Sequence, residues 1–142
     1  GIYGADFSPD GSLLALGGWD GRVSLWGGAN GALCLLRTLT GHTGFVSALA
    51  FAPDGRTLLS ASGDATVRVW CPATGESAGV LEGHTDPVLD FGVLGASAGI
   101  VVTASWDATA RLWRRDTGQV LHTLQHPGPV ACASFSPDQQ MI

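Results

Sequence analysis

Residues 63–70 read GDATVRVW, residues 106–113 read WDATARLW and residues 19–26 read WDGRVSLW. The phrase recurs after 44 residues and again after 43, counted from residue 19 to 63 and from 63 to 106. An Asp stands six residues before the last tryptophan of each phrase, and a Gly stands five residues after it. A fixed period of this length predicts one supersecondary unit that is repeated along the chain.

Within one period, every local signal favours β-strands. The clusters APDG and PATG put Pro and Gly where tight reversals need them. No window longer than ten residues shows an uninterrupted apolar period of 3.6, so helices are not expected. Short runs rich in β-branched and large apolar residues lie between the reversals, at 46–51, 57–62, 66–70 and 77–83. We therefore expect an all-β chain of small four-stranded antiparallel sheets.

Each of these sheets is expected to be apolar on both faces, as VSALAF at 46–51 indicates. Such a sheet must lie between two like sheets, and stacking around a central axis provides this for every copy, which predicts a β-propeller. Propellers close with roughly four to eight blades, so the chain is expected to be an excerpt of a longer protein. Within one propeller domain at 1–142 we expect blades at 2–39, 45–82 and 87–125, and the first strand of another blade at 129–135.

These motifs resemble the WD40 repeat family of β-propellers over essentially the whole chain. The likeness rests on GHT at 41–43 and 83–85, on FSPDG at 7–11 and FAPDG at 51–55, and on the phrases that end at Trp26, Trp70 and Trp113. The dipeptide that names the family is absent at these tryptophans, since Gly27, Cys71 and Arg114 follow them. The resemblance implies a partial propeller of WD40-like blades, about three of them plus one extra strand.

The resemblance also implies a buried line of hydrogen bonds in each blade, from a Trp indole through a hydroxyl and a His to an Asp. Left without partners, such buried groups would cost about 1–3 kcal/mol each. In the first blade Leu16 replaces the hydroxyl and the matching His would precede Gly1, so this line should be incomplete. The implied residues are His42, Ser60, Asp64 and Trp70 in the second blade, and His84, Thr103, Asp107 and Trp113 in the third.

His, Ser and Asp together also suit a nucleophilic triad, which needs an exposed hydroxyl beside an oxyanion hole. Here the trio recurs and ends on a Trp, which favours a structural role, so no catalytic residues are expected. No metal site is expected either, because His122 and His126 would be about 13 Å apart along a strand. The Gly-rich segment 16–21 lacks the Lys and the helix of a phosphate site. We expect no cofactor.

Charge and cysteine content limit the partners and the compartment. The net charge is −5, with seven Arg and no Lys, so direct contact with nucleic acid is not expected. The cysteines Cys34, Cys71 and Cys132 are odd in number and widely spaced, which indicates reduced thiols and an intracellular location, cytoplasmic or nuclear. No apolar run approaches the roughly 18–20 residues of a membrane span, so no membrane partner is expected.

The turns between second and third strands and the loops that enter the inner strands should lie at one end of the sheets, the top rim. Aromatic residues at turn tips are candidate contacts, because Trp is enriched in binding hot spots. The alternative is that Trp19 and Trp106 pack on neighbouring loops. The candidate partner-binding rim consists of Trp19, Phe45, Pro87, Trp106 and Pro129.

The resulting prediction is a non-catalytic scaffold that binds proteins or peptides through this rim, within a larger intracellular assembly and beside the remaining blades of its own chain. One alternative is a regulatory or sensor propeller of a multidomain NTPase signalling protein. Another is the propeller of a ribonucleoprotein-associated scaffold, whose other domains contact RNA. Sequence beyond either end would distinguish them, since a P-loop favours the first alternative and an RNA-binding domain the second.

Overall fold

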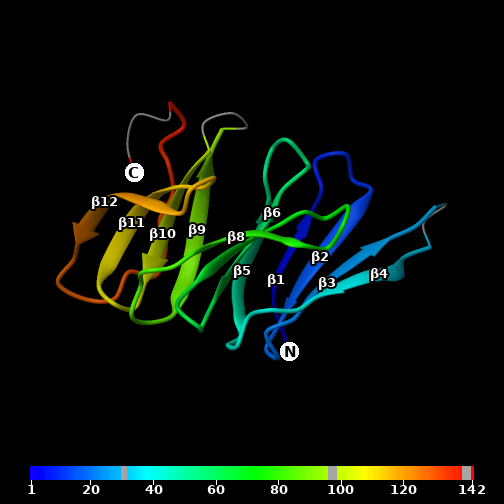
Figure 1. The fold of residues 1–142 in the computed structure, drawn as a ribbon, viewed down its shortest axis with the longest axis horizontal. Coiled ribbons are helices and arrows are strands. Elements are labelled where there is room, and N and C mark those ends of the chain that lie inside the picture. The colour runs from blue at the N-terminus through cyan, green and yellow to red at the C-terminus, as the bar shows by residue number, and fades with distance from the viewer. Residues whose placement is uncertain (30–31, 96–98, 139–141) are drawn as a thin grey trace.

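The structure is a computed structural model that describes residues 1–29, 32–95, 99–138 and 142. The described residues form twelve strands in three four-stranded antiparallel sheets, each with its strands in chain order (Figure 1). The prediction of an all-β chain of four-stranded blades is confirmed. The strands are β1 (Ile2–Phe7), β2 (Leu13–Gly18), β3 (Val23–Gly27), β4 (Cys34–Leu39), β5 (Val46–Phe51), β6 (Leu58–Ser62), β7 (Val67–Trp70), β8 (Ser77–Leu81), β9 (Val88–Leu94), β10 (Ile100–Ser105), β11 (Thr109–Arg114) and β12 (Gln119–Gln125).

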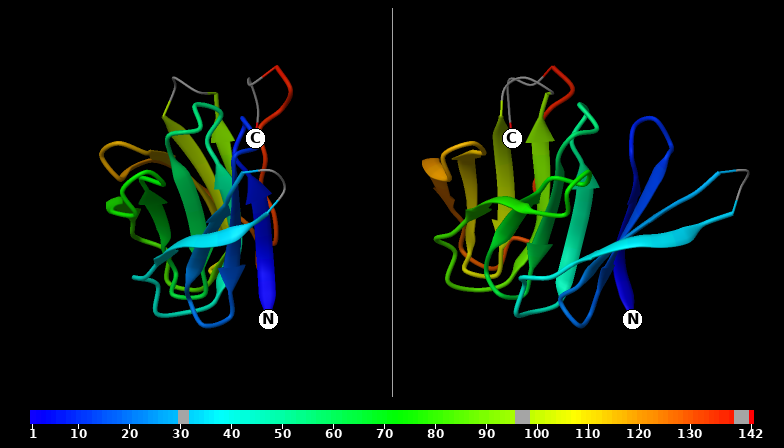
Figure 2. Two further views of the ribbon diagram at one scale, coloured as in Figure 1. Left: turned by 90° about the vertical axis from the view of Figure 1, so that its right-hand side faces the viewer. Right: turned by 45° about the vertical axis from the view of Figure 1, so that its right-hand side comes forward.

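The three sheets stand side by side as blades, with β5 in contact with both β1 and β9 (Figure 2). We refer to β1–β4, β5–β8 and β9–β12 as blades 1, 2 and 3. A hydrogen bond also joins two of the inner strands, because the backbone N–H of Phe51 donates to Oδ2 of Asp6 at 2.8 Å. The middle blade is therefore covered on both faces, as the apolar pattern of 46–51 predicts.

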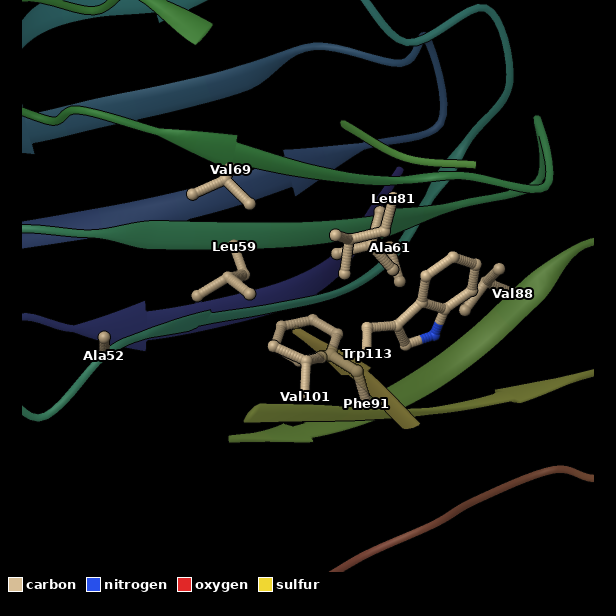
Figure 3. Packing of buried hydrophobic residues seen from close by; sticks show 10 residues of the cluster. Ala52, Leu59, Ala61, Val69, Leu81, Val88, Phe91, Val101 and Trp113 are labelled. Atoms are coloured by element: carbon tan, nitrogen blue, oxygen red, sulfur yellow. The ribbon is translucent and has the colours of Figure 1, made fainter. Parts of the chain in front are cut away.

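The hydrophobic core lies between blades, in two clusters of buried side chains. The cluster between blades 2 and 3 places the fully buried Trp113 beside Val88 and Leu81 (Figure 3). The cluster between blades 1 and 2 contains Trp70 and Val46. Close packing there also depends on the small Gly17, where an added Cβ would stand 2.5 Å from a methyl of Val46. The middle blade therefore contributes its two faces to two different cores.

The repeated Asp explains the tight turns that join the second and third strands. Oδ1 of Asp64 accepts the N–H of Thr66 at 3.0 Å, and Oδ1 of Asp107 accepts the N–H of Thr109 at 2.9 Å. The residue after each Asp has a left-handed backbone, which Gly adopts without strain but Ala does not. The φ angles are 77° at Gly21, 69° at Ala65 and 65° at Ala108.

The segment 129–135, expected to be the first strand of a further blade, forms no strand. A strand needs a ladder partner, and no described residue forms one with this segment. The segment instead lies along β9 of blade 3, where an added Cβ on Gly92 would be 3.5 Å from the carbonyl oxygen of Ala133. One backbone bond fixes its start, from Val130 N–H to Ser105 O at 2.9 Å.

Ala65→Gly is expected to raise the free energy of unfolding by about 1 kcal/mol, because Gly removes the strain of a left-handed alanine at some cost in unfolded-state entropy. Ala78→Gly is the matched control, since Ala78 is exposed in β8 and has no positive φ. That control should lose about 0.5–1 kcal/mol. Urea unfolding followed by tryptophan fluorescence measures both, and a loss of stability in Ala65→Gly would contradict the strain argument.

Candidate functional site

In blade 2, four side chains from separate elements form one continuous line of hydrogen bonds. The indole N–H of Trp70, on β7, donates to Oγ of Ser60, on β6, at 2.8 Å. Ser60 Oγ lies 2.8 Å from Nε2 of His42, in the loop before β5, and His42 Nδ1 lies 2.8 Å from Oδ2 of Asp64. Every donor meets an acceptor when the Ser60 hydroxyl donates to Nε2 and the Nδ1–H donates to the carboxylate.

Blade 3 repeats this line with Thr in place of Ser. Trp113 donates its indole N–H to Oγ1 of Thr103 at 2.8 Å. His84 lies 2.6 Å from Thr103 Oγ1 through Nε2 and 2.6 Å from Asp107 Oδ2 through Nδ1. The structure thus brings together all eight residues that the sequence resemblance implied, four in each blade.

A hydroxyl that the sequence analysis did not single out completes each line. Oγ1 of Thr66 donates to Oδ1 of Asp64 at 2.6 Å, and Oγ1 of Thr109 donates to Oδ1 of Asp107 at the same distance. The backbone N–H of Thr43 also donates to Oδ2 of Asp64, at 3.0 Å. Both oxygens of the carboxylate are therefore satisfied. The available signal was the phrase DAT, which carries Thr two residues after Asp in both blades.

The surroundings favour the ionised Asp and the neutral His in blade 3. Burial alone would raise the pKa of Asp107, but hydrogen bonds from Thr109 and His84 outweigh it and lower this pKa to about 2. Burial lowers the pKa of His84, against the opposing effect of Asp107. In blade 2 the same balance holds the pKa of Asp64 well below its usual value.

Blade 1 has a different arrangement. The indole N–H of Trp26 donates to Oγ of Ser24, two residues away on the same strand, at 2.9 Å. Leu16 occupies the position of Ser60 in the paired strands. The side chain of Asp20 is 64% exposed and lies 3.8 Å from the Arg22 guanidinium. The repeated Asp is therefore a turn residue in all three blades and part of a buried line in blades 2 and 3.

Asp64→Ala is expected to lower the free energy of unfolding by about 2–3 kcal/mol, because it leaves the buried His42 ring and the Thr66 hydroxyl without their acceptor. Asp20→Ala removes the same turn residue where no buried His is in contact, and should change stability by about 0.5 kcal/mol or less. Chemical denaturation compares the two variants. Equal losses would show that the turn, and not the line, carries the stabilisation.

Acid should destabilise blade 3 in two steps. The pKa of Asp107 is about 2 in the folded chain and near 4 when unfolded, so its contribution is complete above about pH 4 and is lost as the pH falls towards 2. The lowered pKa of His84 acts in the same direction below about pH 6.5, because the unfolded chain then binds more protons. Thermal unfolding midpoints measured across this range should fall steadily with acid. A midpoint that rises between pH 6.5 and 5 would contradict this account.

The turn tips and the loops before the inner strands lie together at one end of the blades. The backbone N–H of Gly63 donates to Phe45 O at 2.8 Å, and that of Trp106 donates to Pro87 O at 3.1 Å. Pro129 directly precedes Val130, whose N–H bonds to β10. Thus Phe45, Pro87, Trp106 and Pro129 are all placed at this end, which we call the top rim.

Aromatic rings gather on the top rim between blades 1 and 2. Trp19 stacks on Phe45 with ring centroids 5.1 Å apart and an interplanar angle of 8°. Tyr3 adds a third ring, 5.4 Å from Trp19 and 6.2 Å from Phe45. Trp19 and Tyr3 nevertheless remain 59% exposed, and Trp106 in blade 3 is 54% exposed. Trp19 therefore packs on a neighbouring loop and still presents its ring to solvent.

The opposite end carries a groove of about 410 Å³ between blades 1 and 2, which the sequence analysis did not find. Its lining includes Asp10, Arg56 and Cys71. Hydrogen bonds from Ser8 and Ser12 lower the pKa of Asp10 to about 2, and a hydrogen bond from Thr74 lowers the pKa of the Cys71 thiol. The groove is formed by turns from two blades, so no local pattern in the sequence marks it.

Two further findings concern other kinds of site. Among the described residues, no three His, Cys, Asp or Glu side chains are grouped as ligands for a metal ion. Within the same parts of the chain, no helix has the length and hydropathy of a membrane span.

Repeated four-stranded antiparallel sheets, stacked face to face and fastened by a Trp–hydroxyl–His–Asp line, define the blades of a β-propeller. The family model described as "WD domain, G-beta repeat" matches residues 1–27, 33–71 and 75–114. The chain belongs to the WD40 repeat family.

Curated relatives match parts of the chain. It is 48% identical over 64 residues to Periodic tryptophan protein 2 of Arabidopsis thaliana. The matched stretch covers 45% of this chain and 7% of the relative. It is 33% identical over 108 residues to a guanine nucleotide-binding protein subunit beta of Oryza sativa subsp. japonica. This match covers 68% of the chain and 28% of the relative. Actin-interacting protein 1 of Drosophila melanogaster is 44% identical over 69 residues, which are 49% of this chain and 11% of the relative. The chain therefore spans less than a third of the length of each.

Proposed function

We propose that this chain is part of a non-catalytic scaffold that binds other proteins or peptides through the top rim of a β-propeller, within a larger intracellular assembly. The proposed rim residues are Trp19, Phe45, Pro87, Trp106 and Pro129, to which we add Tyr3 because its ring packs on Trp19. The observation that carries the proposal is the exposure of Trp19 and Trp106 at turn tips, because exposed tryptophans are unusual on a merely solvated surface and frequent in binding hot spots.

The rigidity of the rim supports this role. The turn that carries Trp106 is held by Asp107, whose carboxylate binds the turn backbone on one side and His84 on the other. A backbone hydrogen bond from the N–H of Trp106 to the carbonyl oxygen of Pro87 joins this turn to the neighbouring loop. Loops that are ordered before binding lose little conformational entropy when a partner docks. Rigid loops on a stacked scaffold are thus suited to recognition.

The buried lines support a role without catalysis. The hydroxyls of Ser60 and Thr103 are fully buried, and each is already hydrogen-bonded to an indole and an imidazole. A nucleophilic hydroxyl must instead face a substrate and an oxyanion hole. Fastening the blade is the role that this geometry favours.

The names of two relatives also support an interaction role, since one is a subunit of a guanine nucleotide-binding protein and the other is actin-interacting. The NTPase-linked sensor and the ribonucleoprotein propeller remain alternatives that concern other domains. The intracellular location, cytoplasmic or nuclear, and the remaining blades as neighbours in the same chain also remain predictions.

Trp106→Ala is expected to weaken capture of bound partner proteins by about 30-fold, the loss of a typical hot spot, with little change in the unfolding midpoint. Leu36→Ala is the control, because Leu36 is similarly exposed but lies on β4, away from the top rim. Affinity capture followed by titration of each recovered partner measures the effect. Undiminished affinity in Trp106→Ala, or an equal loss in Leu36→Ala, would refute the rim as the binding surface.

A further inference from the structure

The turn between β11 and β12 carries two arginines shortly before a threonine. It reads RRDTG at residues 114–118. Arg114 precedes Thr117 by three residues and Arg115 precedes it by two, and no other Ser or Thr of the chain has Arg at both of these positions. Kinases that select substrates by charge read basic residues just before the acceptor hydroxyl. The pattern therefore marks Thr117 as a candidate phosphorylation site.

The structure leaves this acceptor and the first of the two arginines accessible. Thr117 and Arg114 are both exposed, and the Arg114 guanidinium forms no hydrogen bond or ion pair with the described residues. The Thr117 hydroxyl accepts the backbone N–H of Gln119 at 3.3 Å. Arg115 differs, because its side chain is only 15% exposed and its Nε donates to Asp116 at 3.3 Å. Arg114 is thus the arginine that a kinase can read in the folded chain.

The cleft of a kinase takes a substrate segment in an extended form, so this tight turn must open. Two backbone bonds hold it, from Gly118 N–H to Arg114 O at 2.9 Å and from Arg115 N–H to Gly99 O at 2.6 Å. The turn leads into β12, the edge strand of blade 3, which is exposed over most of its length (Figure 1). No residue of 114–118 belongs to the two buried clusters. Segments with few buried contacts open at a low cost in free energy.

Blade 2 repeats the same turn without the arginines. Residues 71–75 read CPATG, and Thr74 is exposed like Thr117. Each threonine accepts the backbone N–H two residues further on at 3.3 Å. The glycine that follows has a φ of 81° in blade 2 and 69° in blade 3, and its N–H donates to the carbonyl four residues earlier in both turns. The two threonines thus share backbone geometry and exposure but differ in flanking charge.

One other exposed threonine, Thr40, has an Arg three residues before it. That residue is Arg37, and its guanidinium is already engaged, because Nη2 donates to Ala73 O at 2.8 Å. This bond joins blade 1 to blade 2, and a kinase that read Arg37 would have to break it. Thr40 therefore provides an internal comparison, an exposed acceptor whose arginine is occupied.

We propose that Thr117 is phosphorylated by an arginine-directed Ser/Thr protein kinase that reads Arg114. Oγ1 of Thr117 attacks the γ-phosphorus of ATP, the bond from that phosphorus to the β-phosphate oxygen breaks, and ADP leaves. The hydroxyl proton passes to the catalytic base of the kinase. The phosphate adds a charge of about −1.5 to −2. The turn, which contains Arg114, Arg115 and Asp116, thereby changes from net positive to net negative.

The test incubates the purified chain with ATP and the catalytic subunit of cyclic-AMP-dependent protein kinase, which prefers Arg at these positions, and locates the phosphate by tandem mass spectrometry. Phosphate should appear on Thr117, with far less on Thr40 and none on Thr74. Thr117→Val should abolish the main product. Arg114→Gln should lower its initial rate by about tenfold, the loss of one charge-assisted hydrogen bond.

Cys71→Arg is the matched gain-of-function variant, because it places Arg three residues before Thr74 in the equivalent turn. Blade 3 shows that this turn accepts an exposed Arg at the same position, Arg114. The variant should acquire phosphate on Thr74 and keep it on Thr117. Thermal unfolding of each variant identifies any that fail to fold.

Four outcomes would overturn the proposal. The first is a folded chain that takes up no phosphate on Thr117 while a synthetic peptide of residues 112–121 does, since the turn then does not open. The second is an unchanged rate in Arg114→Gln, and the third is a preference for Thr40. The fourth is a folded Cys71→Arg chain that gains no phosphate on Thr74, because the flanking arginine then does not select the site.

Discussion

Each blade of this protein has two apolar faces and no means of covering them by itself. The structure meets this constraint by placing the cores between blades, so Trp70 is buried against blade 1 and Trp113 against blade 2. Folding of one blade therefore depends on the presence of its neighbour, as expected for stacked repeats. The positions of the rim loops follow from the same stacking, because each loop joins strands that are fixed by an interface.

Apolar packing between blades is non-directional, whereas the hydrogen bonds of the buried polar lines fix the relative positions of specific segments. In blades 2 and 3 a His from the loop before the inner strand reaches the turn between the second and third strands, so two rim segments are fastened to the sheet and to each other. In blade 1 the indole N–H of Trp26 donates to Ser24 on the same strand. This bond satisfies the donor but connects no loop to the sheet. The turn around Asp20 is joined to blade 2 by the stack of Trp19 and Phe45.

The strands and the fold class could be predicted because period, turn residues and apolar pattern are local properties that recur. The buried lines could be predicted only through family resemblance, which implied His42 and Asp64 but not the completing Thr66. The ring of Tyr3 was missed because Tyr3 lies on β1 and Trp19 follows β2. Residue spacing along the sequence does not indicate such a contact between strands. The segment 129–135 has the composition of a strand, but without a ladder partner among the described residues it forms none.

The placement of the cores between blades also bears on how such repeats are exchanged during evolution or protein engineering. A blade boundary drawn through the loop at residues 40–45 follows the sheets, yet it divides the cluster that contains Val46 and Leu39. Swapping one blade for a homologous one would thus create two new mismatched interfaces at once. The residues that pack around a single core come from two neighbouring blades, so an exchange that preserves the core must keep both sets of residues together.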